Sequence, residues 1–225
     1  MDIRRFIFNM LSENTLAVTG APGRCVVIDP GFLEESERES VLGYLDRNGL
    51  VPEAVLLTHG HIDHCYGVSA LQQMFSIPVY MSEADWPVLE YFQRVKKFGL
   101  PVPDISFTRT GVQDGQTIGA AGLTFRVVTT PGHSPGGVCY VVDSERTVFT
   151  GDTLFAGTIG RTDLYLSDYD ALITSIMEKL MALPGDYTVW PGHGSNSTIG
   201  EEMATNPFLE PFNEREEIPE LNDYD

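Results

Sequence analysis

The stretch Thr58-His59-Gly60-His61-Ile62-Asp63-His64 holds three of the five histidines in this chain of 225 residues, together with a carboxylate. These side chains are too densely spaced to share one face of a strand or helix, so the segment must turn, and Gly60 permits the turn. The turn separates them into two groups, because His59 and His61 can converge on one ion while Asp63 and His64 serve a second. Imidazole and carboxylate suit Zn²⁺, Fe²⁺ and Mn²⁺. The stretch therefore predicts a metal site.

Three further glycine-flanked segments carry the remaining histidines and a second carboxylate. They are Pro131-Gly132-His133-Ser134-Pro135-Gly136, Gly151-Asp152 and Pro191-Gly192-His193-Gly194. His133 and His193 can complete the two ligand sets, and Asp152 has two oxygens with which to bridge two ions. Two ions about 3.5–4 Å apart would hold a bridging hydroxide at neutral pH and polarise a carbonyl oxygen. Since no histidine is left over, the pattern favours a dinuclear metallohydrolase over five unrelated structural histidines.

All four segments follow predicted strands in a chain that alternates strands and helices. Strands are predicted at 5–11, 16–18, 25–28, 54–57, 77–81, 106–110, 117–118, 123–129, 138–142, 147–150 and 187–190, the first three as an antiparallel meander. Helices are predicted at 34–48, about 64–74, 82–96 and 167–180 and from Thr198, with Ser82 and Asp85 as a capping box. Loops at strand ends are where α/β enzymes place their chemistry. The pattern predicts an α/β (α+β) domain over residues 1–210.

Composition limits the partners and the compartment. The formal net charge of −18 would repel a phosphate backbone, so nucleic acid is not expected as a partner. Cys25, Cys65 and Cys139 lack paired spacing, which favours a reducing compartment, and Cys65 beside His64 is interpreted as a small buried hydrophobe rather than a ligand. No apolar stretch approaches the roughly 20 residues that span a bilayer. We expect a cytoplasmic protein without a membrane partner, and an acidic C-terminal tail at 211–225.

The four segments, together with Val27-Ile28-Asp29-Pro30-Gly31, resemble the metallo-β-lactamase superfamily. The resemblance runs from about residue 5 to 209 and is closest to the glyoxalase II branch, the hydroxyacylglutathione hydrolases, in its short single-domain bacterial form. It implies a four-layer αβ/βα sandwich of two facing mixed β-sheets flanked by helices, with the metals at one edge. It also implies one ion held by His59, His61 and His133, a second held by Asp63, His64 and His193, and Asp152 as the bridge.

The implied reaction is hydrolysis of a glutathione thioester such as S-D-lactoylglutathione, in which a dimetal-bridged hydroxide attacks the carbonyl carbon. Asp63 and Asp152 are the expected catalytic residues. Two divalent ions are the expected cofactors, Zn²⁺ first, with iron or manganese as alternatives. Arg161 is the candidate for binding a substrate carboxylate, and the competing interpretation is a surface ion pair with Asp163. The sequence favours no particular oligomeric state.

Two departures from the branch keep other reactions open. Longer family members have a further helical domain with basic contacts to glutathione, whereas this sequence stops soon after Phe208. The segment Gly160-Arg161-Thr162-Asp163 has Asp163 where the branch has an aromatic residue, and it also resembles the persulfide dioxygenases, which use one iron. The alternatives are therefore a mononuclear iron persulfide dioxygenase, or a lactonase or other ester hydrolase of the same fold. A non-catalytic metal-binding domain is disfavoured because no ligand is lost.

Overall fold

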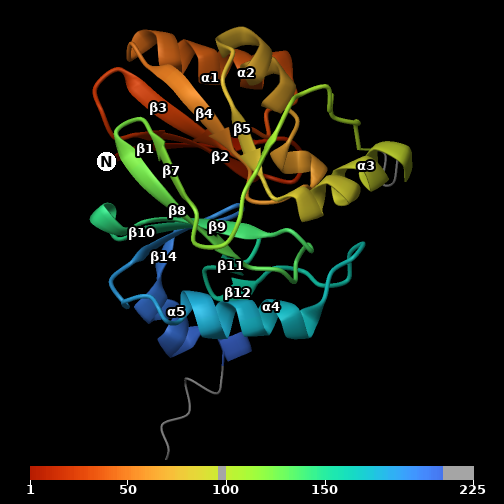
Figure 1. Cartoon of the computed structure of the whole chain (residues 1–225), viewed down its shortest axis with the longest axis vertical. Helices are drawn as coiled ribbons and strands as arrows, with labels where there is room; N and C mark the ends of the chain where they lie inside the picture. Colours follow the sequence, from red (N-terminus) through yellow and green to blue (C-terminus); the bar gives the residue numbers. More distant parts are fainter. Residues whose placement is uncertain (96–99, 210–225) are drawn as a thin grey trace, which may run out of the picture.

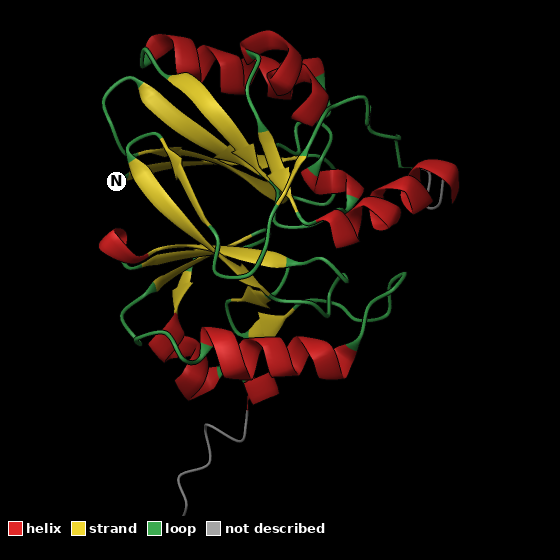
Figure 2. Cartoon of the chain, viewed as in Figure 1, coloured by secondary structure: helices red, strands yellow, loops and turns green. Residues whose placement is uncertain are grey.

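Two six-stranded sheets face each other, and helices cover the outer face of each (Figure 1, Figure 2). The computed structural model describes residues 1–95 and 100–209. The α/β sandwich predicted from the sequence is confirmed by this arrangement. The acidic tail expected at 211–225 and the last residue of the helix expected over 82–96 lie outside the described residues.

The first sheet combines an antiparallel meander with three parallel strands. The meander is β1 (Asp2–Phe8), β2 (Glu13–Thr19) and β3 (Arg24–Ile28), followed by β4 (Val51–Leu56), β5 (Val79–Met81) and β6 (Thr110–Gly111) in parallel. Two helices, α1 (Glu35–Arg47) and α2 (Val68–Phe75), lie over its outer face (Figure 1). The predicted meander is confirmed, and β1 occupies the free edge of the sheet.

The second sheet is mostly antiparallel and has its own helical cover. Its strands, in spatial order, are β14 (Ser197–Thr198), β13 (Thr188–Pro191), β10 (Thr147–Gly151), β9 (Val138–Val142), β8 (Leu123–Thr129) and β7 (Thr117–Ala120). A small hairpin of β11 (Leu154–Phe155) and β12 (Thr158–Ile159) follows β10. The outer face is covered by α4 (Tyr169–Ser175), its π-helical continuation Ile176–Leu180, and α5 (Ile199–Thr205) (Figure 1).

Four layers arise because the central strands are buried on both faces. On β2, Leu16 and Val18 belong to the core between the two sheets, whereas Ala17 belongs to the core beneath the helices. Alternate residues of a strand point to opposite faces, so a strand covered on both sides is apolar throughout. Tyr140 links the sheets, because its buried hydroxyl donates to the carbonyl of Leu57 at 2.8 Å. The three cysteines are buried and free, as expected.

Some local predictions were wrong where tertiary contacts override sequence spacing. The helix expected from residue 64 begins at Val68, after a 3₁₀ turn over Ile62–His64. The strand expected over 106–110 is reduced to Thr110–Gly111, because Phe107 is buried as a loop residue packed under the helices. Ser82 makes no side-chain cap, and α3 (Trp86–Val95) begins only after Asp85.

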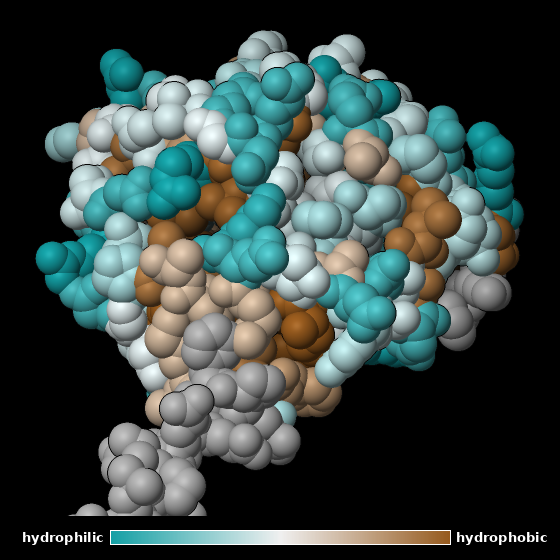
Figure 3. Space-filling model, turned by 60° about the horizontal axis from the view of Figure 1, so that its bottom comes forward, coloured by the Kyte–Doolittle hydropathy of each residue, from teal (hydrophilic) through white to brown (hydrophobic). Residues whose placement is uncertain are grey.

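Seen from the side of α4 and α5, teal and pale residues surround a tan and brown region that lies beside the grey atoms (Figure 3). Some apolar surface is ordinary in folded domains. Within residues 1–95 and 100–209, none of the helices has the length and apolar character required to traverse a bilayer.

Candidate metal centre

All seven predicted ligand side chains converge at one edge of the two sheets. The first stretch follows β4, and the segments with His133, Asp152 and His193 follow β8, β10 and β13 of the other sheet. The residue His64 is fully buried, and His193 is the most exposed of the five histidine side chains at 25%. Because each sheet delivers ligands from strand ends, the position of the centre depends on how the two sheets pack.

One group consists of His59, His61 and His133. Each offers a ring nitrogen, and these three atoms lie within 4.8 Å of one another. The shortest separation is 2.8 Å, between Nδ1 of His61 and Nε2 of His133. This is the trio that the sequence resemblance assigns to one ion.

A second group consists of Asp63, His64 and His193, whose ligand atoms also lie within 4.8 Å of one another. The Nε2 atoms of His64 and His193 are 3.3 Å apart. One carboxylate oxygen of Asp63, Oδ2, lies 3.4 Å from Nε2 of His193 and 3.6 Å from Nε2 of His64. These are the other three residues that the sequence groups together.

Asp152 lies between the two groups. Its Oδ2 atom is 3.4 Å from Nε2 of His133 and 3.5 Å from Nε2 of His193, and its Oδ1 atom is 3.4 Å from Nε2 of His64. Oδ1 is buried and has no hydrogen-bond partner among the described residues, and the same holds for Nε2 of His59. Buried polar atoms without partners are costly, so these atoms fit a cluster that binds cations.

A hydrogen-bond relay fixes the tautomer of His59. The hydroxyl of Thr58 donates to Oδ2 of Asp29 at 2.6 Å, so its oxygen is left to accept from Nδ1 of His59 at 3.0 Å. The proton of His59 therefore sits on Nδ1, and the lone pair of Nε2 faces the cluster. Such outer partners orient metal-ligating imidazoles and set which nitrogen is free.

Three other histidines are held in the same way through Nδ1. His64 donates to Oδ2 of Asp29 at 3.0 Å, His133 to the carbonyl of Arg161 at 2.8 Å, and His193 to the carbonyl of Leu11 at 3.1 Å. Each leaves Nε2 directed at the cluster. Asp29, His59 and His64 form a further group of ligand type, but the oxygens of Asp29 already accept hydrogen bonds from the amide and hydroxyl of Thr58 and from His64. We therefore regard Asp29 as an orienting residue.

Burial and neighbouring charges set different protonation states for the histidines of the metal-free cluster. Burial, reinforced by the other histidine rings, holds the pKa of His59 and of His61 well below its usual value, so both are neutral. Burial also acts to lower the pKa of His64, but Asp63 and Asp152 outweigh it and raise that pKa. His59 and His61 are thus in the neutral form that a metal ligand needs. The two carboxylates favour a positive charge at His64, and they would favour a metal cation for the same reason.

Asp85 joins the two loops that carry the first group. Its Oδ2 atom accepts from the amide of Gly60 and from the hydroxyl of Ser134, each at 2.7 Å, and its Oδ1 atom accepts from the amide of Gly136 at 2.5 Å. Gly60 lies between His59 and His61, and Ser134 follows His133. One fully buried carboxylate therefore fixes all three histidines across the two sheets.

Arg161 lies beside the cluster but is engaged by a neighbour. Its Nε and Nη2 atoms donate to the two oxygens of Asp163 at 2.9 and 2.8 Å, and the two side chains are 70% and 68% exposed. The structure thus contains the ion pair that the sequence offers as the competing interpretation. The backbone of Arg161 has a separate role, because its carbonyl accepts a hydrogen bond from Nδ1 of His133.

Aromatic rings surround the cluster. The ring of Phe92 lies edge-on to His61 at 5.4 Å, and that of Phe155 lies 6.2 Å from His193. Tyr91 of α3 stacks on Tyr165 at 3.8 Å, which joins the helix to the loop after Arg161. A substrate at the cluster would therefore contact flat apolar surfaces as well as polar ligands.

Sequence reasoning did not identify the orienting residues Asp29, Thr58 and Asp85. Asp29 stands in Val27-Ile28-Asp29-Pro30-Gly31, directly after a buried strand, and a carboxylate at a strand end on the ligand edge is a signal that could have been used. Asp85 had no such signal, because its spacing from Ser82 is that of a capping box.

We expect Asp85→Ala to destabilise the metal-free protein by about 3 kcal/mol or more, because it leaves three buried donors without an acceptor. Urea unfolding would measure the loss, and hydrogen exchange would show faster exchange at the amides of Gly60 and Gly136. Asp46→Ala, at an exposed position of α1, is the matched control. Unchanged protection of the two glycine amides would contradict the clamp.

Comparisons with known proteins agree with this geometry. The profile of the Metallo-beta-lactamase superfamily matches residues 10–193. Hydroxyacylglutathione hydrolase GloC of Haemophilus influenzae is 35% identical over 216 residues, which cover 93% of this chain and 98% of that protein. The crystal structure of BLEG-1 B3 metallo-beta-lactamase has a TM-score of 0.83 at 36% identity, with 92% of this chain and 99% of that chain covered. TTHA1623 in a di-iron-bound form has a TM-score of 0.82 at 37% identity, with 92% and 100% covered. The chain therefore belongs to the metallo-beta-lactamase superfamily, as a metal-dependent hydrolase with a histidine and aspartate cluster of metal-binding type.

Proposed function

We propose that this protein is a dinuclear metallohydrolase that cleaves thioesters, with glutathione thioesters such as S-D-lactoylglutathione as the substrate class. The observation that carries the proposal is the position of Asp152, whose two oxygens reach histidines of both ligand groups within 3.5 Å. A carboxylate placed in this way suits a pair of ions. The glutathione carrier is supported by the similarity to GloC, which is named for that activity.

We assign the ligands as the sequence predicts. His59, His61 and His133 would hold one ion, Asp63, His64 and His193 the other, and Asp152 would bridge them. The unpartnered Nε2 of His59 and Oδ1 of Asp152 are atoms that such ions would satisfy. When bound, two divalent ions would supply an activated water at neutral pH and polarise the thioester carbonyl.

The chain's own residues would prepare that chemistry. Asp29 and Thr58 keep the proton of His59 on Nδ1, and the carbonyl of Arg161 does the same for His133. Asp63 is held as a carboxylate, because His64 and His193 outweigh the effect of burial and lower its pKa. It can therefore accept a hydrogen bond from the attacking water and orient it toward the substrate. The aromatic rings of Phe92 and Phe155 would limit access of bulk water.

We further propose that Zn²⁺ is the native metal, that residues 1–210 form the hydrolase domain, and that the protein works in the cytoplasm. Iron is the principal alternative for the metal, since the similar TTHA1623 has been described in a di-iron-bound form. The competing reactions are a persulfide dioxygenase with one iron, as the segment from Gly160 to Asp163 suggests, and hydrolysis of a lactone or another ester. The similarity to BLEG-1 B3 metallo-beta-lactamase adds a β-lactam to the substrates that should be tested.

The decisive experiment measures metal content and activity on the same samples. We expect two metal ions per chain and hydrolysis of S-D-lactoylglutathione that chelation abolishes and Zn²⁺ restores. The same samples would be tested for oxygen uptake with glutathione persulfide and for hydrolysis of a homoserine lactone and a cephalosporin. One iron per chain with persulfide-dependent oxygen uptake would replace the proposal by the dioxygenase. Turnover confined to the lactone or cephalosporin would refute the thioester class.

Asp152→Ala should lose metal and activity together, since it removes the carboxylate shared by both groups. We expect at least one ion fewer per chain and a loss of thioesterase activity on the order of 10³-fold or more. Metal analysis and steady-state kinetics would measure both. Asp170→Ala, an exposed position in the first turn of α4, controls for the change in charge. A fully metallated and active Asp152→Ala protein would contradict the bridge.

We propose that Arg161 binds a carboxylate of the substrate in competition with Asp163. Arg161→Ala should then raise KM for a glutathione thioester by roughly tenfold with little change in kcat, whereas Asp163→Ala should lower KM by freeing the guanidinium. An uncharged thioester serves as the control substrate, and its KM should not change. If both variants behave like the parent on the glutathione thioester, the pair is only a surface ion pair.

A further inference from the structure

Three arginines differ from the other basic residues of the described chain because they form no ion pair there. Residues 1–95 and 100–209 contain eleven lysine and arginine side chains, and eight of these pair with a carboxylate within 4.0 Å. The three without such a partner in this part of the chain are Arg4, Arg5 and Arg47. With 32 aspartates and glutamates in the sequence, carboxylates are not scarce. All three arginines line one groove between β1 and α1.

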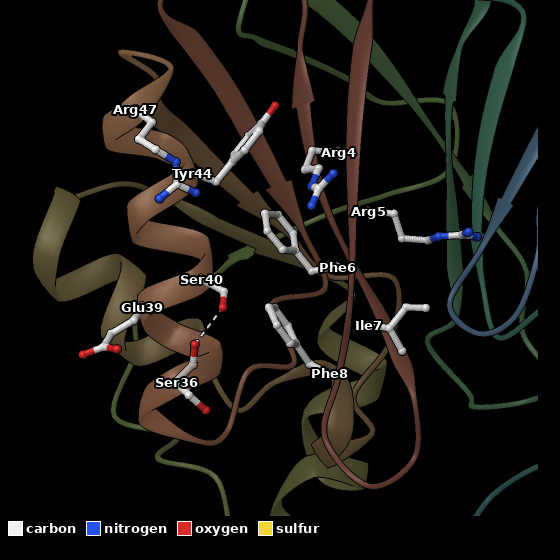
Figure 4. A pocket seen from close by; sticks show the side chains of 10 residues that line it. All are labelled: Arg4, Arg5, Phe6, Ile7, Phe8, Ser36, Glu39, Ser40, Tyr44 and Arg47. Atoms are coloured by element: carbon white, nitrogen blue, oxygen red, sulfur yellow. Dashed lines mark hydrogen bonds between the residues drawn. The ribbon is translucent and has the colours of Figure 1, made fainter.

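This groove, which we name the basic groove, has a volume of about 650 Å³ (Figure 4). It is lined from β1 by Arg4, Arg5, Phe6, Ile7 and Phe8, and from α1 by Ser36, Glu39, Ser40, Tyr44 and Arg47. The two phenylalanines are buried and stack on each other at 5.4 Å. The groove therefore combines an apolar wall with basic and hydroxyl groups, and it lies outside the ligand edge of the sheets.

Arg4 and Arg47 lie on either side of Tyr44, whereas Arg5 points away to the other side of β1 (Figure 4). Arg5 is already engaged there, because its Nη1 atom donates to the carbonyl of Gly194 at 2.9 Å. The guanidinium of Arg4 lies 5.3 Å from the ring centre of Phe6 and 5.8 Å from that of Tyr44. It is thus held over the apolar wall, and within residues 1–95 and 100–209 no carboxylate pairs with it.

Gly43, on the same helix, leaves room for the side chain of Arg47 near Tyr44. A Cβ atom at Gly43 would lie 3.0 Å from Nη1 of Arg47, so the absence of a side chain there makes room for the guanidinium. Glu39 lines the same groove, yet it forms no ion pair with the three arginines. Two guanidinium groups therefore lie on either side of one aromatic ring, and neither forms an ion pair with a carboxylate in the part of the chain that the structure describes (Figure 4).

Charged residues on an edge strand often serve only to discourage pairing with other chains. That role would account for Arg4, which lies on the edge strand β1. It does not account for Arg47, which lies on a helix, or for the position of both guanidinium groups beside one aromatic ring. A binding site explains both arginines together, since paired guanidinium groups bind oxyanions by charge-assisted hydrogen bonds.

We propose that the basic groove binds a small molecule that joins an oxyanion, either a phosphate or a carboxylate, to a flat apolar body. Arg4 and Arg47 would bind the oxyanion, and the ring of Tyr44 with the neighbouring Phe6 would contact the flat body. This site is separate from the metal centre and independent of the thioester proposal. Its ligand would be recognised by charge in a protein whose surface otherwise repels anions.

The test is a titration of the full-length, Zn²⁺-loaded chain followed by two-dimensional NMR of the backbone amides. The probes are phenyl phosphate and benzoate. Inorganic phosphate and phenol represent the two halves of phenyl phosphate, and acetate represents the carboxylate half of benzoate. We expect saturable shifts at Tyr44 and Arg47 with phenyl phosphate or benzoate, and the tighter of the two identifies the preferred oxyanion. Each half alone should bind at least tenfold more weakly. Site resolution separates this binding from any contact with the metal centre.

Arg4→Ala and Arg47→Ala should each weaken binding of the preferred probe at least tenfold. Arg38→Ala is the matched control, because Arg38 is also on α1 and the substitution removes the same charge, but this side chain pairs with Glu35 at 2.7 Å. Both groove arginines are exposed, so the variants should fold, and unchanged spectra elsewhere would verify this. Shifts that do not localise to the groove, or an equal loss in Arg38→Ala, would overturn the proposal.

Discussion

The carboxylate of Asp29 orients histidines in both halves of the metal centre. It accepts a hydrogen bond from His64 directly, and it is linked to His59 through the hydroxyl of Thr58. One carboxylate therefore sets the tautomers of histidines in both groups. Its backbone has φ of 46°, an unfavourable region for a residue other than glycine. The amide of Asp29 donates to Leu56 at 3.1 Å, so the ladder between β3 and β4 holds the residue in place. The fold maintains this local strain where the orientation of the ligands requires it.

The two sheets are held in register at the centre by polar contacts as well as by the apolar core. Asp85 connects the stretch from Thr58 to His64 with the loop of His133. Asn14 likewise connects β2 of the first sheet with the loop of His193. The amide nitrogen Nδ2 of Asn14 donates to the carbonyls of Pro191 and Gly194, each at 3.0 Å, on both sides of His193. A shift of one sheet against the other would break these bonds before it separated the ligands. These bonds therefore add direction to the apolar packing of the two sheets at the edge where the cluster lies.

The two-sheet sandwich was predicted from the resemblance to the superfamily, and the strand pattern placed the candidate ligands at strand ends, where the structure brings them together. The sequence was not enough where a distant partner competes with a local one. Asp85 has the spacing of a helix cap, but its carboxylate accepts hydrogen bonds from Gly60 and Ser134, which lie 25 and 49 residues away in the sequence. Phe107 suggests a strand by its apolar character, yet it is buried by packing against the helix layer. In both cases the deciding contact joins segments whose proximity depends on the complete fold.

The charges around the centre bear on how an anionic substrate could approach so acidic a protein. Arg161 is paired with Asp163, so its net contribution to the local field is small. The proposed ligands Asp63 and Asp152 would contribute two negative charges, whereas two divalent ions would carry four positive ones. A loaded centre would thus be positive at short range within a chain of formal charge −18. Over distances beyond a Debye length of about 8 Å, the acidic surface is screened by salt, and the nearby positive centre dominates. If the proposed thioesterase function holds, the loaded centre itself would attract an anionic thioester, and Arg161 would add to the binding of the substrate carboxylate.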